Sequence, residues 1–135
     1  MSDPETKYKC VEHSDGSWFC ERLDKTVANP KRRFIMTVSV KDSSGSQLVS
    51  LFDDQAVQLL GHTADEIYEM QCNGENAKAE AVYKRALFFE GLLSLKVKSE
   101  TYNDEARIKV VCNAMQPLNF VDESKQLLDA INAFA

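Results

Sequence analysis

The chain has 135 residues, of which 44% are hydrophobic and 27% charged, and these values are typical of a single globular domain. No apolar run is long enough to span a bilayer, and residues 1–6 lack the features of a secretory signal. We therefore expect an intracellular protein, cytosolic or nuclear, with no membrane partner. The net charge of −5 argues mildly against nucleic-acid binding, but the acidic residues gather in the predicted helical middle and the basic residues on predicted strands.

Residues 1–9 are expected to be a loose start, and residues 10–30 to form a compact hairpin that ends at Asn29-Pro30. Three candidate zinc ligands lie in this hairpin: Cys10, His13 and Cys20. A structural zinc site takes four ligands, which leaves two interpretations open. In one, zinc is bound and the shell is completed by Asp24, Glu12 or a water. In the other, the hairpin is metal-free and is pinned by Trp18 and Phe19.

The middle of the chain predicts two strands followed by helices. Residues 33–41 and 47–52 alternate in hydrophobicity around a polar turn. A short helix follows and stops at Gly61, and residues 63–66 (Thr-Ala-Asp-Glu) have the pattern of a capping box that starts a second helix. A third helical stretch runs to about Arg85.

Residues 93–112 predict two long strands joined by a polar turn. Apolar residues alternate with polar ones on both sides of the turn, so the cations share one face, with Tyr102 at its rim. Such a surface suits a single-stranded nucleic acid, because its bases can stack on the aromatic ring while the cations neutralise its phosphates. A solvated strand face is the plainer interpretation.

The last element, residues 121–135, is predicted to be an amphipathic helix with a stripe formed by Leu127, Leu128, Ile131 and Phe134. The stripe either packs on the chain's own barrel or binds partner helices. The order of elements predicts a mainly β protein with helices (α+β). We expect a five-stranded Greek-key barrel of the oligonucleotide-binding type over residues 10–120, with the hairpin as an insert.

Four stretches together resemble the C-terminal DNA-binding domain of the replication protein A large subunit. They are residues 18–21 (Trp-Phe-Cys-Glu), 33–40, 59–66 and 101–109, the last of which is the most specific. The resemblance covers roughly residues 16–134 and implies an oligonucleotide-binding barrel with a zinc ribbon. It also implies non-enzymatic binding of single-stranded DNA, a terminal helix that joins partner subunits, and a location on chromosomes in the nucleus.

The chain departs from the family pattern at two positions. Leu23 stands where the family has the last zinc-binding cysteine, and Leu48 stands where it tends to have an aromatic residue. This drift suggests a specialised paralogue acting on telomeric single strands together with telomerase components.

The predicted DNA-contacting residues are Arg33, Phe52, Phe88, Lys96, Lys98, Tyr102, Arg107 and Lys109. For Phe52, core packing is an equal alternative, and of Phe88 and Phe89 one should face inward. A second functional hypothesis is an assembly scaffold with little DNA binding of its own. A cysteine-dependent enzyme is the weakest hypothesis, because Glu12, Asp15 and Glu21 make the field around the cysteines negative.

Overall fold

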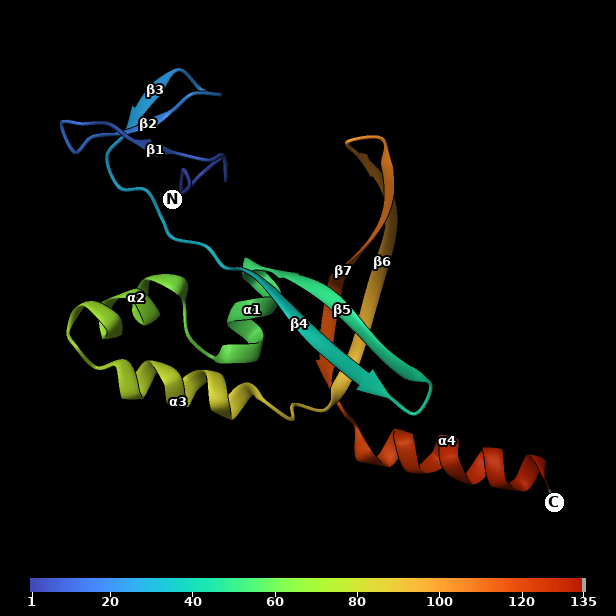
Figure 1. Cartoon of the computed structure of the whole chain (residues 1–135). Coiled ribbons are helices and arrows are strands. Elements are labelled where there is room, and N and C mark those ends of the chain that lie inside the picture. Colours follow the sequence, from blue (N-terminus) through green and yellow to red (C-terminus); the bar gives the residue numbers. More distant parts are fainter. Residues whose placement is uncertain (135) are drawn as a thin grey trace.

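The computed structural model describes residues 1–134 and contains two β-sheets and four helices (Figure 1). The smaller sheet has the order β1-β2-β3 and the larger one the order β4-β5-β7-β6. The strands are β1 (Val11–Glu12), β2 (Trp18–Cys20), β3 (Lys25–Val27), β4 (Ile35–Asp42), β5 (Gly45–Phe52), β6 (Gly91–Tyr102) and β7 (Glu105–Pro117). The helices are α1 (Asp53–Leu60), α2 (Ala64–Cys72), α3 (Asn76–Ala86) and α4 (Phe120–Ala133).

The smaller sheet, which we call the ribbon, lies apart from the larger sheet and is joined to it by an extended linker (Figure 1). Its core consists of Cys10, Cys20 and Val27, with four further side chains packed around them: Met1, Tyr8, Trp18 and Leu23. Residues 1–9, predicted to be loose, are tied to the ribbon. Met1 O accepts a hydrogen bond from Cys10 N at 3.0 Å, and the Ser2 backbone pairs with Lys31 through two 2.8 Å bonds.

The larger sheet consists of two antiparallel hairpins, β4–β5 and β6–β7, that cross each other (Figure 1). They meet through parallel pairing of Ser50 with Val111. Side chains alternate between the two faces of each strand. The inward face packs on α1 and forms the main core, whose buried members are Val49, Leu51, Ala56, Val110, Cys112 and Met115.

The prediction of a mixed α+β fold is confirmed, but the five-stranded barrel is not: in residues 1–134 the larger sheet has four strands. The late segment expected to supply two or three strands is used entirely by β6 and β7, which are 12 and 13 residues long. The ribbon precedes these four strands instead of interrupting them. As a result β4 and β6 are both edge strands, and the inward-facing Leu95 and Val97 of β6 remain exposed.

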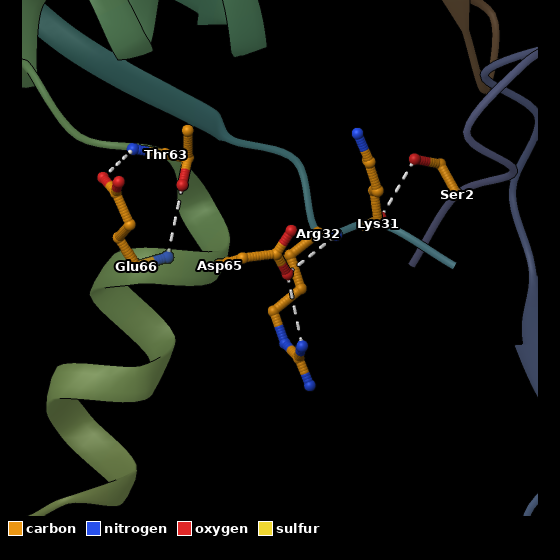
Figure 2. A network of polar contacts seen from close by, with 6 residues as sticks. All are labelled: Ser2, Lys31, Arg32, Thr63, Asp65 and Glu66. Carbon is orange, nitrogen blue, oxygen red and sulfur yellow. Dashed lines mark hydrogen bonds and ion pairs between the residues drawn. The ribbon is translucent and has the colours of Figure 1, made fainter. Parts of the chain in front are cut away.

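The helical segment is anchored to the linker by a polar network (Figure 2). The predicted capping box is confirmed. Thr63 Oγ1 accepts from Glu66 N at 3.3 Å, and Glu66 Oε2 accepts from Thr63 N at 2.9 Å, which lowers the Glu66 pKa. In the same turn of helix, Asp65 Oδ1 accepts from both the backbone N and the Nη1 of Arg32, each at 3.3 Å. The network fixes the start of α2 against the linker that leads into β4.

Helix α4 projects away from the larger sheet (Figure 1), and none of its residues is buried. Its first turn is capped by Asn119, whose side-chain oxygen accepts from Val121 N at 3.2 Å. Of the two interpretations of its apolar stripe, packing on the chain's own sheet is therefore wrong. None of the helices in the described chain combines the length and the apolar character that crossing a membrane requires.

Candidate nucleic-acid interface

The outward face of the β6–β7 hairpin gathers most of the predicted DNA-contacting residues. In this antiparallel pair, residues directly opposite each other share a face. Lys98 lies opposite Lys109, and Tyr102 lies opposite Glu105. Two further pairs belong to the same face: Lys96 with Val111, and Glu100 with Arg107. The outward phase is thus basic, while the alternate phase supplies Val110 and Cys112 to the core.

Tyr102 stands at the tip of this face, beside the turn that reverses the chain. Asn103 and Asp104 adopt positive φ angles of 49° and 62°, which is the geometry of a tight hairpin turn that matches the twist of the strands. The Tyr102 side chain is 63% exposed. The guanidinium carbon of Arg107 lies 5.7 Å from the ring centroid, which is within the range of a cation–π contact.

Lys98 and Lys109 face each other directly across the two strands. Within residues 1–134 neither forms an ion pair, although Arg107 lies 3.7 Å from the Glu105 carboxylate. Like charges directly opposite in a sheet repel each other and cost stability. An anion placed between the two ammonium groups would relieve that repulsion, which is what a phosphate backbone provides.

The outward face continues from β7 onto β5 and β4. Because Ser50 pairs with Val111, the residues two positions away on β5, Leu48 and Phe52, also point outward. Phe52 is paired with Ile35, and all three apolar side chains are exposed. Of the two alternatives for Phe52, the outward face is therefore the one that the structure shows. Sequence reasoning missed Ile35, although its alternation with Met36 contains that information.

Arg33 and Phe88 are not brought to Tyr102. Arg33 lies in the linker before β4, beside Tyr68 and Tyr83 in a shallow pocket, and its Nε is buried without a hydrogen-bond partner. Phe88 precedes β6 at the end of the strand away from Tyr102, with a positive φ of 64° and a side chain that is 97% exposed. Of the pair Phe88 and Phe89, the less exposed is Phe89, at 42%, and both precede β6, which begins at Gly91.

The three predicted zinc ligands are not assembled into a metal site. Cys10 and Cys20 are buried together. The pKa of the Cys10 thiol is raised, mainly by burial and to a smaller extent by the neighbouring Cys20. His13 lies elsewhere, with its ring 5.4 Å from that of Phe19 in an edge-to-face contact. Across residues 1–134 no three histidine, cysteine or acidic side chains converge as metal ligands would. The structure thus brings Cys10 and Cys20 together but not His13, because short spacing in sequence does not make side chains converge.

The predicted partner-binding residues are all exposed, three of them on α4 and the fourth, Phe134, at its C-cap. They are Leu127, Leu128, Ile131 and Phe134. Phe120 and Val121 add to the same surface at the start of the helix, where they line a shallow hollow with Leu128.

Comparisons with known proteins find relatives that match nearly the whole chain. The 70 kDa DNA-binding subunit of replication protein A from Gallus gallus is 34% identical over 123 residues, and one of its counterparts in Oryza sativa is 32% identical over 125 residues. Replication factor A protein 1 of Saccharomyces cerevisiae is 32% identical over 124 residues. The matches cover 91–92% of this chain but only 13–20% of those proteins, so the chain spans a fifth of their length or less.

Two solved structures share the fold. One is a replication protein A heterotrimer bound to single-stranded DNA, with a TM-score of 0.87 and 27% identity; the match covers 99% of this chain and 31% of that one. The other is yeast replication protein A bound to single-stranded DNA, with a TM-score of 0.86 and 30% identity; that match covers 99% and 75%. The family model described as the replication factor-A C-terminal domain matches residues 3–127. This chain belongs to the replication factor-A C-terminal domain family.

Proposed function

We propose that the chain binds single-stranded DNA on the outward face of its larger sheet. The observation that carries the proposal is the placement of exposed Tyr102 on the same face as the directly opposed cations Lys98 and Lys109. Relatives of the chain are named as DNA-binding subunits, and both structural neighbours are bound to single-stranded DNA. This supports the prediction of a binding module that is not an enzyme.

The chemistry of the face favours unpaired over paired bases. Stacking on an exposed aromatic ring contributes about 1–3 kcal/mol per base and tolerates any sequence, but it requires a base that has left the duplex. The ring of Tyr102 offers one such platform, and the apolar strip of Ile35, Leu48 and Phe52 offers further contact area. The cations add affinity that falls as salt rises.

The test is a titration of fluorescent oligonucleotides, single-stranded and duplex, at several salt concentrations. Tyr102→Ala should weaken single-strand binding by about 5- to 100-fold. Lys98→Ala with Lys109→Ala should lower affinity and flatten the salt dependence by roughly one unit of slope per lost contact.

The matched control changes two lysines of α3, Lys78→Ala with Lys84→Ala. Both are exposed and each is paired with a glutamate of its own helical segment, at Glu75 and Glu80. This double variant removes the same charge but should leave affinity nearly unchanged. Equal weakening by both lysine pairs, or equal affinity for duplex and single strands, would contradict the proposal.

Arg33 and Phe88 stay predicted contacts at positions remote from Tyr102. If Arg33→Ala weakens DNA binding, the bound DNA continues past Ile35 onto the linker. If Phe88→Ala weakens DNA binding, the bound DNA runs along the whole length of β6. The two substitutions therefore map the path of the DNA, and the titration above measures both.

The narrower role at telomeres also stays a prediction, motivated by the divergence at Leu23 and Leu48. It expects tighter binding of G-rich telomeric repeats than of a mixed sequence of equal length at the same salt. Equal affinities would remove the ground for that role, and with it the expected association with telomerase components. A nuclear, chromosomal location is part of the same prediction.

A second function is favoured by the exposed stripe of α4. We propose that this stripe binds the helices of partner subunits, in keeping with the heterotrimer among the structural neighbours. Leu128→Glu with Ile131→Glu, or deletion of residues 121–135, should abolish association with partner subunits in co-purification. Gln126→Glu with Ala133→Glu adds the same number of acidic side chains at exposed positions on the opposite face of the helix and should preserve association. If the deletion leaves the complex intact, this function is refuted.

A further inference from the structure

The ribbon of this chain has an apolar centre. Cys20 is fully buried, and Cys10 and Val27 are nearly so. Leu23, which stands where the family pattern has a metal-binding cysteine, packs against these three residues. Its backbone N donates to Cys20 O at 3.2 Å, so the turn that would present a fourth ligand presents an aliphatic side chain instead. The Cys10 thiol is also engaged, since it donates to Tyr8 O at 3.7 Å.

The histidine that could have supplied another ligand is held away from the two thiols. His13 N donates to Ser17 O at 2.8 Å, and His13 O accepts from Gly16 N at 2.9 Å, which fixes a tight turn at the solvent-exposed end of the ribbon. The exposed imidazole packs edge-to-face on Phe19. Moving His13 to the thiols would break both this turn and this aromatic contact.

Residues 1–9 supply the cross-links that a small hairpin of this size otherwise takes from a metal. The Asp3 side chain is 2% exposed, and its Oδ1 accepts from Glu5 N at 2.8 Å and Thr6 N at 2.9 Å. Its Oδ2 lies 3.6 Å from the Nζ of Lys25 on β3. The N-terminal segment thus closes on the strand at the far edge of the ribbon, and its backbone contacts also reach Cys10 and Lys31.

We propose that this ribbon folds without a metal ion, with Leu23 filling the space beside the two thiols and with residues 1–9 acting as the clasp. The ribbon has lost its metal requirement because an aliphatic core and a buried aspartate now hold it together. The inference concerns folding alone, so it stands or falls independently of DNA binding.

Trp18 makes the ribbon directly observable, because it is the only tryptophan of the chain and lies on β2. The chain is produced in zinc-supplemented medium, and its metal content is measured by elemental analysis. Thermal unfolding is then followed by Trp18 fluorescence with and without a strong chelator. We expect no stoichiometric zinc and the same unfolding midpoint in both samples. One zinc per chain, together with a lower midpoint in chelator, would overturn the proposal.

Cobalt titration tests the position of residue 23. The wild-type chain should show no thiolate–cobalt absorption band. Leu23→Cys adds a third thiol beside Cys10 and Cys20 and should produce the band. An unchanged spectrum of Leu23→Cys would contradict the placement of this residue next to the thiols.

The clasp is tested by a pair of aspartate substitutions. Asp3→Asn should lower the Trp18 midpoint by roughly 4 °C, because it weakens the contacts that tie residues 1–9 to β3. Asp15→Asn is the control: Asp15 accepts from Ser17 N at 2.9 Å in the same ribbon but is exposed. It should leave the midpoint nearly unchanged, and equal shifts for the two variants would refute the clasp.

Discussion

The ribbon and the larger sheet solve the problem of covering apolar side chains in opposite ways. The ribbon has only three buried core residues, yet residues 1–9 and the surrounding aromatic side chains enclose them. The larger sheet has twice as many, but two inward side chains of its edge strand β6, Leu95 and Val97, remain exposed, with Val97 at 64%. Whether a core is shielded from solvent therefore depends on which segments of the chain cover it, and not on the number of core residues.

The largest effect is expected from Leu51→Ala in the larger sheet. Leu51 is 1% exposed, and removing its side chain should cost about 2–5 kcal/mol through lost burial and a residual cavity. Urea unfolding followed by far-ultraviolet circular dichroism should show the loss, while the Trp18 signal keeps its midpoint. If both midpoints fall together, the two regions unfold as one cooperative unit, and the expectation that they unfold independently is wrong.

The reciprocal change is Val27→Ala in the ribbon, with an expected cost of about 2 kcal/mol for a buried valine. Here the Trp18 midpoint should fall while the circular dichroism of the larger sheet is preserved. Lysine or arginine contacts to DNA should also persist, because the ribbon supplies none of the residues on the outward face. A variant that lost single-strand binding would tie the ribbon to the DNA site.

A smaller effect, of opposite sign, is expected from Lys98→Ala. Removing one of two directly opposed lysines should stabilise the β6–β7 hairpin by about 0.2–1 kcal/mol, even as it weakens DNA binding. Lys96→Ala is the matched control, since Lys96 faces Val111 and relieves no repulsion. Stability is read from urea midpoints. Equal gains for the two variants would show that net charge, and not the opposed pair, is responsible.

The smallest effect concerns pH. The hydrogen bond from the Thr6 backbone, followed by that from Glu5 and the charge of Lys25, holds the pKa of Asp3 below its usual value. Asp3 therefore stabilises the ribbon above the unfolded pKa of about 4, and this contribution is lost as pH falls through the lower folded pKa. The difference in Trp18 midpoint between wild type and Asp3→Asn should shrink on going from pH 7 to pH 3. A constant difference would mean that Asp3 acts without its charge.

Local patterns in the sequence predicted the elements well because their causes are local. The capping box at Thr63 and Glu66 depends on two residues three positions apart. The outward phase of the late hairpin follows from strict alternation, so the shared face of Lys98 and Tyr102 could be derived without coordinates.

The remaining features depend on contacts between distant segments. The number of strands in the sheet was predicted from the order of the elements, whereas strand pairing decides it. Cys10, His13 and Cys20 are close in sequence, but a turn fixed by Ser17 separates the imidazole from the thiols. The buried Asp3 is paired with Lys25, 22 positions later, and no periodic pattern in the sequence predicts this contact.

The two edge strands of the larger sheet, β4 and β6, have a consequence for the exchange of peptide hydrogens with solvent. Along β4 and β6, every second residue directs its peptide N–H away from the single neighbouring strand. Deuterium uptake in these two strands should therefore alternate between slow and fast sites, whereas in β5 and β7 the alternation should be lost around Ser50 and Val111, where these two strands pair with each other.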